Sequence, residues 1–255
     1  MAKSTLRFII GAILCVPFIS YAETITIRAD NWFPMNGDPG AANPGYMIEI
    51  AQKIFATAGH KVDYKTMPWK RALEFVEKGK FDCVVGAYKE DAPNFVFPSK
   101  SWGYDQPAFF VKKGNSWKYK GISSLDAIKL GVIGDYHFDD EFDKYVADNK
   151  KKNVQSLKTS NALDQNIKKI LGGRIDATIE SKVVMQAKLK ELGKEGEVVE
   201  AGNLLSEPSP IYIACSPAKP LSKELIKIID EQTPKLRASG ELQKILDKYG
   251  LKDWK

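Results

Sequence analysis

Cysteine and histidine are scarce in this sequence of 255 residues, which contains three cysteines and two histidines. Two histidines are too few for a histidine-rich metal site, and no cysteines have the paired spacing of a zinc site. Cys15 lies in a segment that we expect to be removed, which leaves Cys83 and Cys215. We expect no metal and no other cofactor. The two cysteines are interpreted either as small buried residues or as a pair that can oxidise.

Signatures of catalysis and of nucleic-acid binding are also missing. The sequence has no Gly-x-Ser-x-Gly elbow and no glycine-rich phosphate loop. Its 38 lysines and arginines outnumber its 32 acidic residues, but they are spread along the chain and form no basic stripe. We predict that the protein is not an enzyme and has no nucleic-acid partner, and we expect a monomer.

Only one long apolar run is present, from Phe8 to Ile19. It follows the basic residues Lys3 and Arg7, is short for a membrane span, and ends at the small-residue site Ser20-Tyr21-Ala22. This order is typical of a secretory signal peptide. We therefore predict a cleaved signal peptide over residues 1–22 and a soluble product in the periplasm.

One short pattern occurs twice. Gly79-Lys80-Phe81-Asp82 and Gly173-Arg174-Ile175-Asp176 each follow a helix-like segment and precede an apolar run. Glycine can end a helix in the left-handed conformation, and the apolar run is typical of a buried parallel strand. Two copies of such a unit predict two similar α/β lobes, with a cleft between them that can hold a small molecule.

The rest of the chain alternates between apolar strands and amphipathic helices, which predicts parallel sheets with crossover helices. We predict strands over residues 24–29, 62–66, 81–87, 108–112, 130–133, 153–157, 175–179 and 211–215, and helices over 46–58, 69–78, 138–146, 162–171, 182–192 and from 222 to the end with breaks at Pro234 and Gly240. Lobe 1 is expected to comprise residues 23–111 and 211–255, and lobe 2 residues 112–210. The strands 108–112 and 211–215 are expected to join the lobes as a hinge.

Five segments in order carry a family resemblance: Gly45–Ala51, Gly79–Asp82, Leu130–Gly134, Gly173–Ala177 and Leu242–Gly250. With them the chain resembles family 3 of the bacterial extracellular solute-binding proteins over nearly all of the mature sequence. The resemblance implies the type II periplasmic binding fold, in which two lobes, each a mainly parallel sheet flanked by helices, are joined by two hinge strands. It also implies capture of a small polar solute, an amino acid or related carboxylate, for an ABC importer.

The resemblance has two further consequences. Its topology implies that Cys83 and Cys215 lie on neighbouring antiparallel strands, where a disulfide can form. Amino-acid binders of the family also carry a Thr-x-Glu-Arg segment whose arginine grips the ligand carboxylate, but the equivalent residues 87–93 here contain no arginine. Arg71 or Lys89 could replace it, and we expect Arg71 to do so because a planar guanidinium binds both carboxylate oxygens.

Ligands of open parallel sheets bind beyond the carboxyl ends of the strands. Aromatic rings near these ends could pack against a ligand. Gly134 opens a loop whose backbone N–H groups could hold an anion, and Glu180 could accept a hydrogen bond from a ligand ammonium. The predicted ligand-binding residues are Trp32, Trp69, Arg71, Tyr88, Gly134, Asp135, Tyr136 and Glu180.

Two other functions stay open. Some proteins of this fold are periplasmic dehydratases acting on cyclohexadienyl acids, and that chemistry needs a buried general acid, for which Glu180 is the candidate. Alternatively, the ligand-bound protein could report to a membrane receptor instead of an ABC permease. The sequence does not separate these two partners, because both would use the same closed form.

Overall fold

The computed structural model describes residues 22–255. The expected signal peptide lies outside these residues except for Ala22. The strands are β1 (Thr24–Ala29), β2 (Lys61–Thr66), β3 (Cys83–Ala87), β4 (Gly103–Asp105), β5 (Pro107–Lys112), β6 (Leu130–Ile133), β7 (Val154–Leu157), β8 (Ala177–Ser181), β9 (Val198–Asn203) and β10 (Ser209–Cys215). The helices are α1 (Tyr46–Thr57), α2 (Trp69–Glu77), a short 3-10 helix (Ile122–Ala127), α3 (Asp140–Asn149), α4 (Ala162–Leu171), α5 (Lys182–Glu191), α6 (Leu221–Ala238) and α7 (Glu241–Asp247). None of the described helices is long and apolar enough to cross a membrane.

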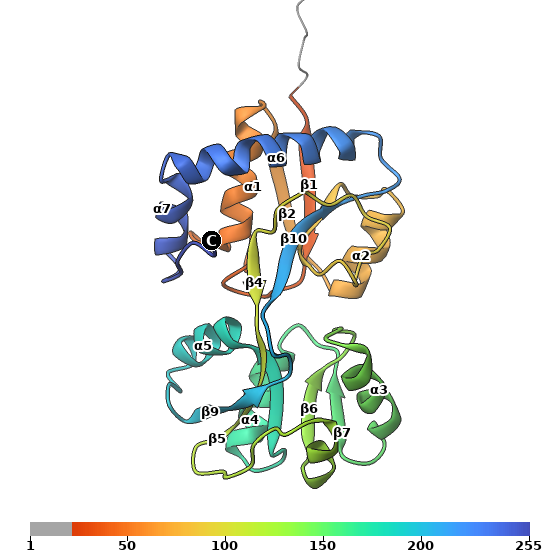
Figure 1. Cartoon of the computed structure of the whole chain (residues 1–255), viewed down its shortest axis with the longest axis vertical. Coiled ribbons are helices and arrows are strands. Elements are labelled where there is room, and N and C mark those ends of the chain that lie inside the picture. The colour runs from red at the N-terminus through yellow and green to blue at the C-terminus, as the bar shows by residue number, and fades with distance from the viewer. Residues whose placement is uncertain (1–21) are drawn as a thin grey trace, which may run out of the picture.

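The strands form two sheets of the same design, one in each of two lobes (Figure 1). The strand order is β2-β1-β3-β10-β4 in lobe 1 and β7-β6-β8-β5-β9 in lobe 2. In each sheet the first three strands are parallel and the last two run antiparallel to their neighbours. The predicted pair of similar α/β lobes is therefore confirmed.

The repeated glycine–aspartate pattern performs the same structural task in both lobes. The Asp82 carboxylate accepts a hydrogen bond from the Thr26 backbone N–H over 2.7 Å, and the Asp82 N–H donates to the Thr26 carbonyl. Asp176 makes the matching pair of bonds with Lys129, again with a carboxylate distance of 2.7 Å. Each aspartate thus fixes its strand against the neighbouring parallel strand.

The two connections between the lobes differ from the prediction. The chain leaves lobe 1 between β4 and β5, at Gln106, and returns between β9 and β10, over residues 204–208 (Figure 1). The segments 108–112 and 211–215 are not free connectors, because they lie inside the two sheets. Their apolar character reflects this burial. The expected boundary at 111/112 is also wrong, because all of β5 belongs to the sheet of lobe 2.

A proline that was expected to break the last helix does not do so. Pro234 lies inside α6, and a left-handed Gly240 separates α6 from α7 as predicted. The buried face of α6, with Leu225, Ile229 and Thr233, packs against the lobe and offsets the roughly 3 kcal/mol that an internal proline costs a helix. The short edge strand β4 and the mixed-polarity strand β9 were not predicted.

Cys83 and Cys215 form a disulfide. They face each other on the antiparallel strands β3 and β10, in the central part of the lobe 1 sheet. This confirms the strand arrangement implied by the family resemblance and decides between the two interpretations of the cysteines. The bond lies on β3, whose carboxyl end leads directly into the cleft between the lobes.

Candidate ligand-binding site

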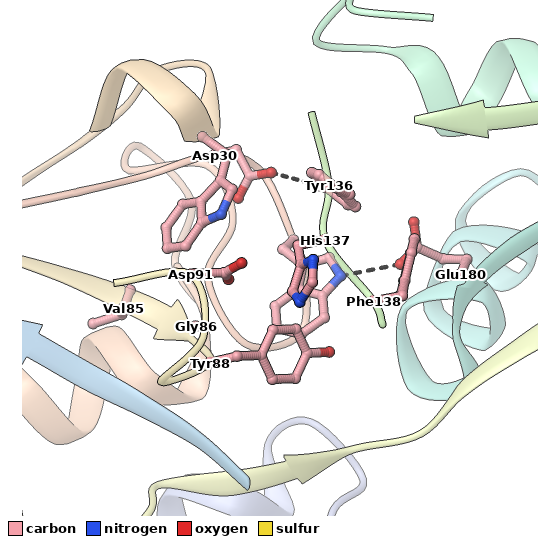
Figure 2. Close-up of a pocket in the computed structure, with 11 residues that line it drawn as sticks. Asp30, Val85, Gly86, Tyr88, Asp91, Tyr136, His137, Phe138 and Glu180 are labelled. Carbon is pink, nitrogen blue, oxygen red and sulfur yellow. Dashed lines mark hydrogen bonds between the residues drawn. The ribbon is translucent and has the colours of Figure 1, made fainter. Parts of the chain in front are cut away.

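Side chains from both lobes meet beyond the carboxyl ends of the parallel strands. Asp30 follows β1, Tyr88 follows β3 and Tyr136 comes soon after β6, while Glu180 is the second-last residue of β8. They line a narrow cavity with a volume of about 30 Å³ in this closed form. We call it the aromatic cavity, and its lining residues are Asp30, Trp32, Trp69, Val85, Gly86, Tyr88, Asp91, Tyr136, His137, Phe138 and Glu180 (Figure 2).

Two hydrogen bonds cross the cleft and hold the lobes together. The Trp32 indole N–H of lobe 1 donates to Glu180 Oε1 of lobe 2 over 3.1 Å. In the opposite sense, the Tyr136 hydroxyl of lobe 2 donates to Asp30 Oδ2 of lobe 1 over 2.5 Å (Figure 2). The structure is therefore a closed form in which both lobes contribute polar groups to one cavity.

Glu180 is a buried carboxyl group, with only 2% of its surface exposed. Burial raises the pKa of Glu180 to about 8. The hydrogen bonds from Trp32 and from the Ser181 N–H lower this pKa but do not offset the effect of burial. The negative charges of Asp105 and Asp30 raise it further. Glu180 is therefore largely protonated at neutral pH.

Further acidic groups surround Glu180. Burial raises the pKa of Asp30 to about 6, although the hydrogen bond from Tyr136 opposes the rise. Burial likewise raises the pKa of Asp91 to about 6, with the nearby His137 acting in the opposite direction. Asp105, which is 1% exposed, accepts a hydrogen bond from the Tyr88 hydroxyl over 2.5 Å and has a pKa raised by burial. The cavity thus concentrates acidic groups in a poorly solvated space.

A second, wider cavity adjoins the first and shares Asp30, Trp69, Tyr136 and Glu180 with it. Its volume is about 480 Å³, and we call it the adjoining cavity. Its further lining includes Gly134, Asp135, Lys70, Lys158 and the start of α4. Asp135 has a left-handed backbone (φ 68°) and forms an ion pair with Lys158 at 2.6 Å.

Of the eight predicted residues, the structure brings seven to the cleft. Five line the aromatic cavity, namely Trp32, Trp69, Tyr88, Tyr136 and Glu180. Gly134 and Asp135 line the adjoining cavity instead.

Arg71 is the exception, because it lies exposed on α2 and lines neither cavity. The reason is helix geometry. Trp69, Ala72 and Val76 form the buried face of α2, and a residue two positions after Trp69 points about 200° away from it. The alternative clamp, Lys89, is also exposed, and its ammonium lies 5.2 Å from the centre of the Tyr212 ring. The predicted guanidinium clamp is therefore not found at this site.

Several lining residues were missed by the sequence analysis. Asp30 stands directly after the first strand, so its position alone could have identified it. Asp91 lies among exposed charged neighbours in the loop after β3, and no periodic pattern there indicates which side chain turns inward. His137 and Phe138 follow Tyr136 in the loop that enters the cleft from lobe 2 (Figure 2).

The family model of the bacterial extracellular solute-binding proteins, family 3, matches residues 25–252. The chain belongs to this family. Among related proteins, the probable amino-acid-binding protein YxeM of Bacillus subtilis (strain 168) is 24% identical over 212 residues, covering 80% of this chain and 75% of that protein. A solute-binding function is therefore established at the level of the family.

Solved structures confirm the predicted fold. An ancestral arginine-binding protein bound to arginine superposes with a TM-score of 0.71 at 23% identity, over 89% of this chain and 97% of the other. A histidine kinase sensor domain with similarity to periplasmic binding proteins also reaches 0.71, at 18% identity, over 89% and 95% of the two chains. At such identities the likeness extends to the fold alone.

Proposed function

We propose that the protein captures a small, nitrogen-bearing polar solute, such as an amino acid or an amine, between two lobes that close on it. The observation that carries the proposal is the aromatic cavity, to which both lobes contribute hydrogen-bonding groups that meet across the cleft. Membership of an extracellular solute-binding family supports a place in the periplasm after removal of residues 1–22. The name of the Bacillus subtilis relative supports the amino-acid class.

Delivery to an ABC importer is the partner role that we favour, with the protein acting as a monomer. The two chain crossings between the lobes support a hinge of limited freedom, which lets a permease distinguish the closed form from the open form. The likeness to a histidine kinase sensor domain keeps a membrane receptor as the alternative partner. Genes for a permease and an ATPase beside this gene would favour the importer.

A dehydratase is the second candidate function, and Glu180 is the observation in its favour. A buried carboxyl group with a pKa of about 8 is protonated at neutral pH and could act as a general acid. However, a cyclohexadienyl acid carries carboxylates, and the residues that line the aromatic cavity include no lysine or arginine to hold them. Binding without chemistry therefore has the stronger support.

Small-angle X-ray scattering combined with thermal unfolding tests solute capture, using protein that starts at Glu23. We expect a solute that raises the melting temperature to reduce the radius of gyration toward that of the closed structure. Trp32→Ala, which removes one wall and one cross-lobe bond, should lose both effects. The exposed substitution Glu195→Gln should keep them. A stabilising solute that leaves the radius unchanged would contradict closure, and a full panel of amino acids and amines without any stabilising member would contradict the function.

A further inference from the structure

We propose that the aromatic cavity selects an organic cation, a solute carrying an ammonium or guanidinium group, and that it recognises this group without a clamp for a carboxylate. The inference rests on the proposed function and narrows its ligand class. It replaces the expectation of a carboxylate ligand held by Arg71.

The charges around the cavity are almost all of one sign. Asp30 and Asp91 from lobe 1 and Glu180 from lobe 2 line it, and the buried Asp105 lies behind Tyr88. The residues that line it include no lysine or arginine. Its one basic residue, His137, is already paired with Asp143, since Nδ1 lies 2.5 Å from the Asp143 carboxylate. A carboxylate placed here would meet three acidic side chains and no cation free to hold it.

Three lysines beside the cleft are engaged with other groups or line the adjoining cavity. The Lys89 ammonium lies over the Tyr212 ring, and Lys158 pairs with Asp135 at 2.6 Å. Lys70 and Lys158 line only the adjoining cavity. These positions leave the aromatic cavity itself without a positive counter-charge from the described residues.

The aromatic walls of the cavity also favour a cationic ligand. Five aromatic rings line the cavity, from Trp32, Trp69, Tyr88, Tyr136 and Phe138. The faces of such rings attract ammonium and guanidinium groups, most strongly where water is excluded. Rings also pack against the apolar part of an amine, so both ends of the ligand would find a complementary surface.

The acidic groups lie on opposite sides of the cleft, which links the ligand charge to closure. Asp30 and Glu180 are each hydrogen-bonded to an aromatic residue of the other lobe. A cation between them would pair with both lobes at once. Burial raises the pKa values of Asp30, Asp91 and Glu180 to between about 6 and about 8, and a bound cation would favour their charged forms.

Calorimetry with matched ligand pairs tests the inference. Agmatine and arginine differ only by the carboxylate, as do cadaverine and lysine, and glutamine and glutamate serve as the neutral and anionic members of the panel. We expect the decarboxylated amine of at least one pair to bind about tenfold or more tightly than its amino acid, because a carboxylate would face the acidic cavity without a counter-charge. Tighter binding of the amino acid in both pairs, or binding of glutamine or glutamate alone, would overturn the cation class.

Two variants of one loop make the test specific. Asp91→Asn keeps the size of the side chain but removes its charge, and should weaken amine binding by about 10- to 150-fold, as expected for loss of a hydrogen bond to a charged group. Glu90→Gln is the control, because Glu90 is exposed and does not line the aromatic cavity. Equal affinity of both variants would remove Asp91 from the site. If a neutral or anionic solute binds and contracts the protein in scattering, the cation class fails while solute capture stands.

Discussion

The Trp32 indole donates its hydrogen to Glu180 across the cleft, over 3.1 Å, and so joins the two lobes at the wall of the aromatic cavity. Glu180 is held from its own lobe by the Ser181 N–H at 2.8 Å. Its carboxyl group is therefore fixed in orientation before any ligand arrives, and it faces a space that contains other acidic groups. This arrangement is costly for a carboxylate alone and favourable for a carboxylate with a cationic ligand.

Glu180→Gln should separate the cost of burying a carboxylate from its attraction to a cationic ligand. The glutamine oxygen can still accept from Trp32 and Ser181, but it offers no charge to a ligand. We expect the affinity for an amine ligand to fall by about 10- to 150-fold while the ligand-free protein melts at the same or a higher temperature. Calorimetry and thermal unfolding measure the two quantities, and Glu195→Gln, an exposed substitution in lobe 2, is the matched control. An unchanged affinity would remove Glu180 from the binding site.

Binding should strengthen as the pH rises from about 5 to about 8. Glu180, with a pKa of about 8, and Asp30 and Asp91, with pKa values of about 6, must lose their protons to pair with a cation. Affinity is expected to rise by up to about tenfold per pH unit for each group that must ionise, and to level off above the highest pKa.

The other titratable groups around the cavity do not reverse this trend. Tyr88 and Tyr136 have pKa values raised well above the usual value by burial and stay neutral. Asp105 also has a raised pKa, and its ionisation would favour a cation. The one basic side chain that lines the aromatic cavity, His137, is paired with Asp143. Calorimetry in buffers of different ionisation enthalpy should detect proton release on binding at pH 7. An affinity that is flat or falls over this pH range would contradict the cation site.

Arg71→Ala should leave binding almost unchanged, within about twofold, because the side chain is exposed and lines neither cavity. Trp69→Ala, two residues earlier on α2, removes a ring that lines both cavities and should weaken binding by about tenfold or more. Calorimetry of the two variants with one ligand gives the comparison. A large loss for Arg71→Ala alone would restore the guanidinium clamp.

The disulfide between Cys83 and Cys215 determines how many reactive thiols the protein should contain. Protein that lacks residues 1–22 should show no reactive thiol after unfolding without reductant, because Cys83 and Cys215 are bonded. Reduction should lower the free energy of unfolding by about 2–5 kcal/mol. In the double variant Cys83→Ala, Cys215→Ala, reductant should have no effect on stability. Two reactive thiols in the unreduced protein would contradict the bond.

Much of the fold could be predicted because local sequence patterns indicate the positions of its strands and helices. The two glycine–aspartate segments mark equivalent junctions, and the apolar runs around them have the length and composition of buried strands. What could not be predicted depends on neighbours that are distant in the sequence. The run Ile211–Cys215 is equally apolar as a connector or as a sheet strand, and only its pairing with β3 distinguishes the two.

Part of the candidate site could also be predicted from the sequence. Residues at strand ends, such as Tyr88 and Glu180, follow from the rule that ligands bind at the carboxyl edge of parallel strands. Arg71 was placed at the site from its chemistry alone, whereas its direction depends on its position around α2, which the buried residues Trp69 and Ala72 determine. Asp91 was missed because the direction of a side chain in a polar loop depends on tertiary packing.

The mass and charge of the solute that copurifies with the protein decide whether the aromatic cavity binds an organic cation. Protein prepared from its native host and gently denatured should release a small molecule that mass spectrometry identifies. We predict an amine or guanidine that is positively charged at neutral pH and that binds again to the protein after removal of the ligand and refolding. Release and rebinding of an anionic carboxylate such as glutamate would contradict it.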